Sequence, residues 1–316
     1  MDASAQARVL GGGVSNIVVL VEDGRTRIVV KQSLPQLRVR DRWLADRSRI
    51  VREWQAMREL CSVLPLGRLP ALRFLDAGRF LYAMDATGLG STDWKSHLLA
   101  GRCDPAIARS AGATLGLMVR GTWRDPRFAS RFGDQRAFWQ LRTDPYYRTI
   151  ARRHPDISGA VEEWIDESSS RRVAMVHGDW SPKNLLVEGR NIVCIDFECA
   201  HFGDPSYDAG FLLNHLLLKS FHRPGSAAAY LDLARSALCW TLAMLPAQAL
   251  PWFERAAMRH LALLMLARVD GKSPVEYLHR AETRATVRSL ALRLIAERPP
   301  TLRAVLSRVL AATGRP

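Results

Sequence analysis

Short apolar runs rich in β-branched residues alternate with polar turns over the first quarter of the chain, which is typical of a small antiparallel sheet. The pattern predicts strands over Arg8–Leu10, Ser15–Val21, Thr26–Lys31, Leu69–Leu75 and Arg79–Met84. Between the third and fourth of these strands, apolar residues recur at helical spacing and predict one amphipathic helix from about Asp46 to Leu64. We therefore expect a small sheet with one main helix.

Helical periodicity dominates after the turn-rich stretch Asp85–Gly90. The predicted helices are Asp93–Ala100, Asp104–Arg120, Ala209–Lys219, Ala227–Ala243, Trp252–Val269, Pro274–Glu297 and Thr301–Ala312, with further helices of undefined limits in Trp123–Ser170. We place a hinge at the turn-rich stretch and expect an α+β protein of two lobes, residues 1–85 and a larger, mostly helical lobe of residues 86–316.

The stretch Val173–Glu198 interrupts the helices. Two apolar runs with β-branched residues lead into polar loops, and Glu188–Asn191 supplies a turn between them. The predicted order is strand, polar loop, hairpin and polar loop. Such loops expose carboxylates beside a rigid sheet.

Composition excludes several classes of protein. The chain has 316 residues, 48% of them hydrophobic, so it can bury a sizeable core. Apolar stretches such as Phe211–Leu218 are too short to cross a bilayer, and the first residues lack a signal-peptide pattern. We therefore expect a cytoplasmic protein without a membrane partner. The five scattered cysteines include no Cys-x-x-Cys pair and indicate neither a disulfide framework nor a zinc site.

The net charge of +14 would suit a polyanionic partner. However, 40 of the 45 basic residues are arginines that are spread along the whole chain without forming a basic stripe. We therefore do not expect nucleic acid as a partner. The sequence does not indicate the oligomeric state.

The first lobe contains two candidate phosphate-binding features. Gly11, Gly12 and Gly13, with Ser15 and Asn16, form a loop that lets backbone N–H groups approach a phosphate, although alone it fits an ordinary hairpin equally well. In the third strand, Lys31 could reach nucleotide phosphates, or it could simply extend into water. Glu53, on the predicted helix, could pair with Lys31 or be solvated.

The loop His177–Asn184 carries the most specific pattern. Asn184 follows Asp179 by five positions, and Asp196 comes twelve positions later at the end of the next strand. This spacing favours phosphoryl transfer, in which one carboxylate accepts a hydroxyl proton while an amide oxygen and a second carboxylate hold Mg²⁺.

With these motifs, the sequence resembles the aminoglycoside phosphotransferase and choline kinase superfamily, whose members have a protein-kinase-like fold and use ATP and Mg²⁺. The resemblance implies a nucleotide-binding N-terminal lobe and a C-terminal lobe that carries catalysis and substrate binding. It implies the following roles: Asp179 as catalytic base, Asn184 and Asp196 as metal ligands, Lys31 with Glu53 as the phosphate-orienting pair, and His177 and Asp208 as supports of the catalytic loop.

Only six residues separate Asp196 from Gly203, which leaves no room for a peptide-docking loop and favours a small hydroxylated acceptor. Two segments, Gly12–Asn16 and Lys31–Pro35, are similar to the methylthioribose kinase family. That family also has an Asp-x-Glu metal motif, so the similarity makes Glu198 a candidate second metal ligand. An aminoglycoside and a sugar-like alcohol such as methylthioribose both remain possible acceptors.

Two other hypotheses compete with that of an ATP-dependent small-molecule kinase. A metal-dependent phosphohydrolase could use His177, Asp179, Asp196, His201 and Asp204, but it leaves the N-terminal pattern unexplained. A catalytically silent nucleotide-binding module would be expected to have lost catalytic residues, and none is degraded. The kinase hypothesis accounts for both lobes and is favoured.

Overall fold

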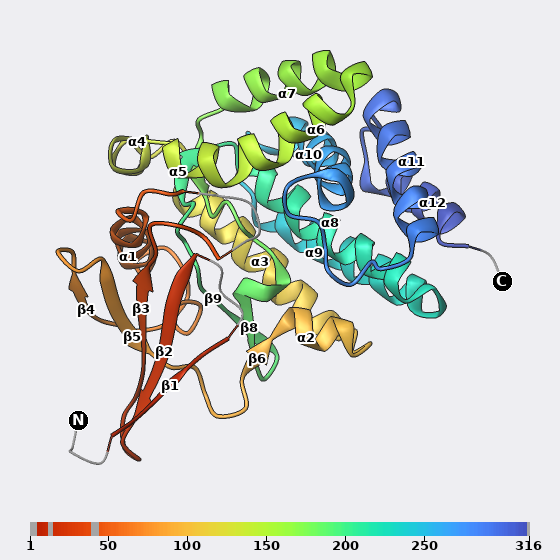
Figure 1. Cartoon of the computed structure of the whole chain (residues 1–316). Helices are drawn as coiled ribbons and strands as arrows, with labels where there is room; N and C mark the ends of the chain where they lie inside the picture. Colours follow the sequence, from red (N-terminus) through yellow and green to blue (C-terminus); the bar gives the residue numbers. More distant parts are fainter. Residues whose placement is uncertain (1–4, 12–14, 39–43, 315–316) are drawn as a thin grey trace.

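The computed structural model describes residues 5–11, 15–38 and 44–314. Its N-terminal part is a five-stranded antiparallel sheet in the order β1-β2-β3-β5-β4. The strands are β1 (Gln6–Val9), β2 (Asn16–Glu22), β3 (Arg27–Ser33), β4 (Leu72–Asp76) and β5 (Leu81–Asp85). One helix, α1 (Arg49–Leu60), packs against β3, β4 and β5 (Figure 1).

The sequence of α1 explains which of its faces is buried. Ile50, Met57 and Leu60 are fully buried and recur at helical spacing, so they form one stripe against the sheet. Glu53 lies on the same stripe and is also fully buried. The helix therefore carries a carboxylate into the apolar interior, where it requires a polar partner.

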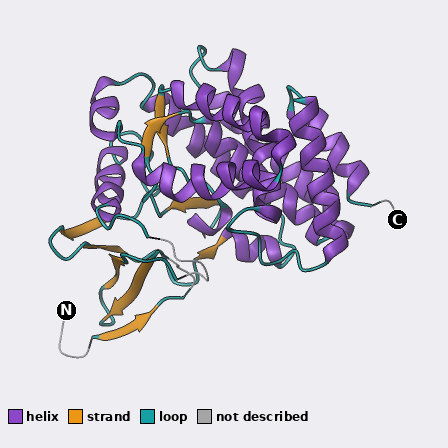
Figure 2. Ribbon diagram, turned by 45° about the horizontal axis from the view of Figure 1, so that its top comes forward, coloured by secondary structure: helices purple, strands orange, loops and turns teal. Residues whose placement is uncertain are grey.

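The remainder is mostly helical and contains two smaller sheets (Figure 2). Its α-helices are α2 (Trp94–Leu99), α3 (Pro105–Gly121), α4 (Pro126–Phe132), α5 (Arg136–Phe138), α6 (Thr149–Arg153), α7 (Ser158–Ser170), α8 (Ser206–His222), α9 (Ala227–Met244), α10 (Leu250–Asp270), α11 (Ala281–Glu297) and α12 (Leu302–Ala312). A π-helical stretch, Trp139–Arg148, joins α5 to α6. One small sheet has the order β6-β8-β9, and the other pairs β7 with β10. Their bounds are β6 (Thr92–Asp93), β7 (Ala174–Val176), β8 (Leu185–Glu188), β9 (Asn191–Cys194) and β10 (His201–Gly203).

The predicted fold class is confirmed, with two local corrections. The helix predicted from Pro274 begins only at Ala281. In the preceding segment Val275, Tyr277 and Leu278 are buried and Glu276 is exposed, but the segment forms turns and irregular structure rather than a helix. Strands β6 and β10 were not predicted, because two or three residues are too few to show a periodicity.

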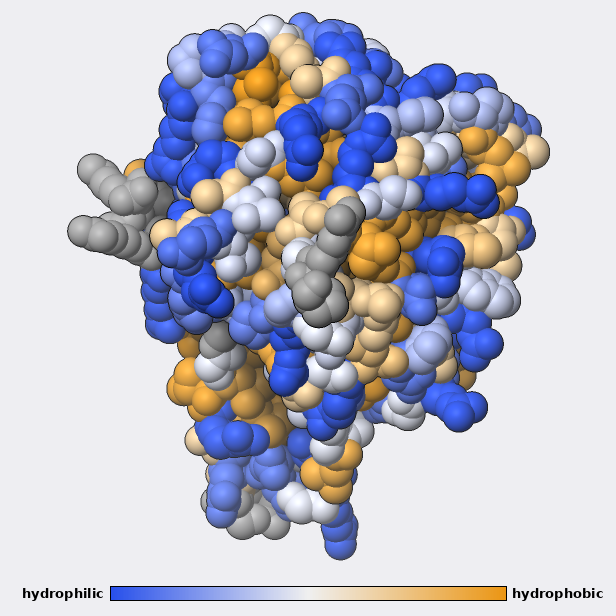
Figure 3. Space-filling model, turned by 90° about the vertical axis from the view of Figure 1, so that its right-hand side faces the viewer, coloured by the Kyte–Doolittle hydropathy of each residue, from blue (hydrophilic) through white to orange (hydrophobic). Residues whose placement is uncertain are grey.

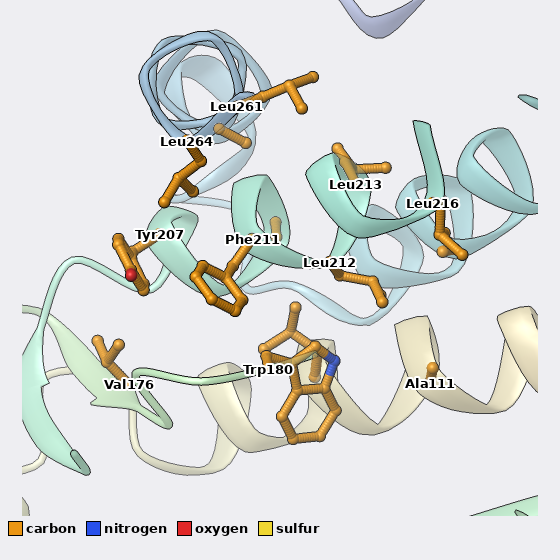
Figure 4. Packing of buried hydrophobic residues seen from close by; sticks show 14 of the residues in the cluster. Ala111, Val176, Trp180, Tyr207, Phe211, Leu212, Leu213, Leu216, Leu261 and Leu264 are labelled. Atoms are coloured by element: carbon orange, nitrogen blue, oxygen red, sulfur yellow. The ribbon is translucent and has the colours of Figure 1, made fainter. Parts of the chain in front are cut away.

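Helix α8 lies at the centre of the helical part. Every residue from Ser206 to Phe221 is buried, as expected of a helix that packs on all sides. Figure 4 shows Phe211 and Leu212 on the side of α8 that faces Trp180, while Leu261 of α10 lies on the opposite side. This packing joins the loop that contains Trp180 to the rigid core.

The surface drawn in Figure 3 mixes hydrophilic residues with smaller apolar areas. Within the described ranges, no helix is long and apolar enough to cross a membrane.

The contact between α3 and α9 gives a test of the packing. A Cβ atom on Gly112 would lie 2.0 Å from the carbonyl oxygen of Ala237, whereas a Cβ on Gly159 of α7 would meet nothing within 4 Å. We expect Gly112→Ala to lower the free energy of unfolding by about 1–3 kcal/mol, since two helix backbones must separate. Gly159→Ala should leave stability unchanged or raise it by up to about 1 kcal/mol. Urea unfolding of both variants measures this, and equal stability of the two would contradict the packing.

Candidate active site

Lys31 lies at the junction between the five-stranded sheet and the helical part. It stands on β3, opposite Val18 of β2 and Tyr82 of β5. Its ammonium group contacts Glu53 Oε1 at 2.8 Å and Asp196 Oδ1 at 2.5 Å. The structure therefore brings Lys31 and Glu53 together, and it adds Asp196 from the segment after β9.

These three groups set one another's charge. Burial alone would lower the pKa of Lys31, but Asp196 and Glu53 raise it well above the usual value. Burial would raise the pKa of Asp196, but Lys31 and Lys183 hold it below the usual range. Burial raises the pKa of Glu53 to about 7, and the hydroxyl of Tyr82 donates to its Oε1 at 3.0 Å. Lys31 thus remains a cation and Asp196 an anion at neutral pH.

The loop after β7 is held by a buried carboxylate. The backbone N–H groups of His177 and Gly178 donate to Asp208 Oδ2 at 2.6 Å and Oδ1 at 2.9 Å. Gly178 has φ +78°, and a Cβ there would lie 2.6 Å from the Cβ of Cys199, so the position requires glycine. A different carboxylate, Asp204, accepts the N–H of Ser206 at the start of α8 (3.1 Å).

His177 connects this loop to the segment that carries Asp196. Its Nδ1 accepts the N–H of Asp179 (3.1 Å), and its Nε2 lies 3.0 Å from the carbonyl oxygen of Ile195. Burial lowers the pKa of His177 to about 4, so the ring is neutral and Nε2 is the donor. A second bond runs from the N–H of Ile195 to the carbonyl oxygen of Asn184 (3.1 Å). The two loops therefore form one unit.

Asp179 is buried and contacts two cations through one oxygen. Arg142 Nη2 and Lys183 Nζ each lie 2.9 Å from Asp179 Oδ2. Arg142 also donates from Nε to the carbonyl oxygen of Gly178 (2.7 Å). Burial would raise the pKa of Asp179, but the two cations lower it below the usual value. The carboxylate is ionised, and its Oδ1 is left outside these ion pairs.

Arg142 was not predicted from the sequence. It comes from the π-helical stretch in the polar span Trp123–Ser170, for which only helices were expected. Pro145, which disrupts regular helical bonding there, was a signal of irregular structure, but it does not identify the contact with Asp179.

Asn184 and Asp196 supply the oxygen atoms that suit a hard cation. The side-chain nitrogen of Asn184 donates to the carbonyl oxygen of Asp179 (3.0 Å), so its oxygen is the atom left to bind a ligand. Asp196 has φ +73°, a strained backbone conformation for a residue other than glycine, and its side chain is 17% exposed. Carboxylate and amide oxygens are ligands that Mg²⁺ accepts, so these two residues fit that ion.

Glu198 was predicted as a second metal ligand, but its side chain contacts other protein groups. Its Oε1 accepts the hydroxyl of Ser15 (2.9 Å), and its Oε2 accepts Arg49 Nε (3.1 Å) and Asn16 Nδ2 (3.2 Å). Both oxygens are therefore occupied by residues next to the glycine loop. Gly11 is exposed, while Gly12 and Gly13 lie outside the described residues.

The residues required by the phosphohydrolase hypothesis are engaged in other contacts. His201 Nδ1 lies 3.0 Å from the carbonyl oxygen of Cys199, and Asp204 pairs with Arg171 at 2.6 Å. Among the described residues, no three His, Cys, Asp or Glu side chains are grouped as a metal site would need. His201 and Asp204 therefore serve other contacts in this structure.

Comparisons with known proteins identify a family for this sequence. Residues 6–245 match the model of the phosphotransferase enzyme family APH. Methylthioribose kinase of Escherichia coli is 26% identical over 244 residues, which cover 68% of this chain and 58% of that protein. Methylthioribose kinase 1 of Oryza sativa is 23% identical over 246 residues, covering 69% and 57%. The chain thus spans less than two thirds of the length of these relatives.

Solved structures share the fold. Aminoglycoside phosphotransferase APH(2'')-Ib with ADP bound aligns with a TM-score of 0.51 and 16% identity, covering 96% of this chain and 94% of that one. An amicoumacin kinase in complex with AMP-PNP aligns with a TM-score of 0.56 and 12% identity, covering 94% and 90%. Because the family match extends over more than half of the sequence, this protein belongs to the APH phosphotransferase enzyme family.

Proposed function

We propose that this protein is an ATP- and Mg²⁺-dependent kinase that transfers the γ-phosphate to a hydroxyl group of a small molecule. The observation that carries the proposal is the position of Lys31 between Glu53 and Asp196, at 2.8 and 2.5 Å. Phosphoryl transfer depends mainly on positioning the reactants and on neutralising charge. A cation that two carboxylates hold at the junction of a sheet and a catalytic loop suits both needs.

The nucleotide would bind along the sheet. We assign residues 1–85 to a nucleotide-binding lobe and residues 86–316 to a catalytic and acceptor-binding lobe. Lys31 would contact the phosphates, and the loop Gly11–Asn16 would cover them with backbone N–H groups. Glu198 would hold that loop in place through Ser15 and Asn16. Because ATP is the phosphate donor, we further propose that the enzyme works in the cytoplasm.

Asn184 and Asp196 would hold the metal. When bound, Mg²⁺ supplies positive charge that neutralises the phosphate oxygens. The strained backbone of Asp196 and the hydrogen bond from Asn184 to the Asp179 carbonyl fix both ligands before binding. Fixed ligands reduce the entropy lost when a metal and a nucleotide bind.

Asp179 would accept the proton of the acceptor hydroxyl. Its Oδ2 is held by Arg142 and Lys183, so Oδ1 is the atom available for the hydroxyl. The same two cations keep the carboxylate ionised, as a base must be. For the acceptor itself, the names of the relatives favour a sugar-like alcohol such as methylthioribose, while the structural neighbours include aminoglycoside kinases.

Replacement of the base tests the proposed function. We expect Asp179→Asn to lower kcat by about 10²- to 10⁴-fold, because the acceptor hydroxyl loses its proton acceptor. The Kd for Mg-ATP, measured by calorimetry, should change little. Turnover is measured in a coupled ADP-release assay with the best acceptor from a panel of sugars, sugar acids, aminoglycosides and amino alcohols. Asp166→Asn, which changes an exposed carboxylate on α7, is the matched control. Undiminished turnover by Asp179→Asn would refute the assignment.

Lys31 provides a test of the nucleotide side. We expect Lys31→Met to lower kcat/KM for ATP on the order of 10²-fold, because the phosphates lose a preorganised positive charge. Lys272→Met is the control, since Lys272 is an exposed lysine whose nearest carboxylate, Asp144, lies 4.0 Å away. Steady-state kinetics with varied ATP measure both. Equal kcat/KM values for the two variants would contradict the proposed site.

A further inference from the structure

Five basic side chains, one of them in the catalytic loop, are linked by the electrostatic effect of four of them on the fifth, and we call them the basic cluster. They come from four elements, and the proposed phosphoryl-transfer steps use none of them except Lys183, which pairs with Asp179. The basic cluster consists of Lys95 on α2, Lys183 in the catalytic loop, His215 and Lys219 on α8, and Arg268 on α10.

His215 lies within electrostatic reach of the other four members. Burial lowers the pKa of its imidazole well below the usual value, and four positive charges lower it further: those of Arg268, Lys219, Lys183 and Lys95. The imidazole is therefore neutral and adds no charge of its own. Four cations from three helices and the catalytic loop therefore act on one neutral imidazole ring.

Two of these cations have carboxylate partners. Lys183 pairs with Asp179, and Lys95 pairs with Glu276, which is 62% exposed. An exposed carboxylate is well solvated and can give way to a ligand at low cost. Lys95 is thus available to a stronger anion.

Lys219 and Arg268 form no ion pair with any carboxylate within the described ranges. The ammonium of Lys219 is fully buried, donates to the carbonyl oxygen of His215 (3.1 Å) and lies 5.0 Å from the ring centre of Tyr277. Arg268 donates to Tyr146 Oη (3.2 Å) and Ser273 Oγ (3.1 Å), while its buried Nε has no partner. The hydroxyl of Tyr277 is also buried without a partner.

Such an arrangement is costly without an anion. Burial, together with the positive charges of Lys95 and Arg268, lowers the pKa of Lys219 to about 7. Lys219 lies in the last turn of α8, whose partial negative charge offsets only about half of one positive charge. Buried cations are normally paired, so an unpaired cluster indicates a ligand that completes it.

Lysine usage supports a specific role. The chain contains only five lysines among its 45 basic residues, yet Lys95, Lys183 and Lys219 all belong to the basic cluster. A compact ammonium group acts as a point charge, whereas the arginines used elsewhere in this protein are suited to planar contacts.

Resting on the proposed kinase function, we propose that the phosphate acceptor is an anionic alcohol, with a carboxylate or phosphate group that binds Arg268 and Lys95 while its hydroxyl reaches Asp179. Lys219, which is fully buried, would add positive potential without touching the acceptor. The same charges would repel a polycationic aminoglycoside. A hydroxy acid and a sugar phosphate share the required chemistry.

Pairs of acceptors that differ by one anionic group test this inference. The wild-type enzyme is assayed with Mg-ATP and glycerate against glycerol, gluconate against glucitol, glucose 6-phosphate against glucose, and kanamycin as a cation. We expect kcat/KM to be at least about tenfold higher for the anionic member of a pair, as is typical of hydrogen bonds to charged groups. The first two pairs report a carboxylate and the third reports a phosphate.

Variants of the cluster add a second measurement. Arg268→Gln should raise KM for the best anionic acceptor by about tenfold, and Lys219→Met should raise it several-fold, with KM for ATP unchanged in both. Lys272→Met, outside the cluster, should change neither constant. Arg268 is half-buried, so its variant remains informative even where Lys219→Met fails to fold.

The outcomes separate the inference from the function on which it rests. Faster turnover of neutral or cationic acceptors, or unchanged acceptor KM in Arg268→Gln, would overturn the anionic acceptor and leave the kinase standing. Absence of acceptor-dependent ADP release with all of these compounds and with methylthioribose would overturn both.

Discussion

The ion pairs of Lys31 join the two parts of this protein. The ammonium lies on a sheet strand, one carboxylate partner comes from helix α1, and the other comes from the segment after β9, 165 residues away along the chain. Each group alone would be costly to bury, and together they neutralise one another. The position of the catalytic loop relative to the sheet therefore depends on this triad.

Rigid support of the catalytic loop follows from a second layer of buried polar groups. Asp208 holds two backbone N–H groups, and the neutral ring of His177 bridges Asp179 to the strand end before Asp196. Burial raises the pKa of Asp208 to about 7, which shows the cost of placing a carboxylate there. Helix α8 carries both this support and Lys219, the fully buried cation of the basic cluster, so core packing fixes the proposed base and the proposed acceptor side together.

The sequence alone identified those candidate residues that belong to short motifs with a fixed spacing. Asp179, Asn184 and Asp196 were identified by spacing because the chemistry needs them on adjacent loops, and the small sheet with its helix followed from periodicity. Arg142 was missed, because its contact with Asp179 spans 37 positions and leaves no local pattern. Glu198 was proposed as a metal ligand from the resemblance to a family with an Asp-x-Glu motif, but a motif does not show that its oxygens face Ser15, Asn16 and Arg49. The basic cluster was not predicted from the sequence, because tertiary packing assembles it from four elements that are far apart along the chain.

The most direct test of a single phosphoryl-transfer site is a crystal structure with Mg²⁺ and a non-hydrolysable ATP analogue. We expect phosphates in contact with Lys31, the metal on Asn184 and Asp196, and the terminal phosphate facing Asp179. A nucleotide bound elsewhere, or a metal held without these residues, would contradict it.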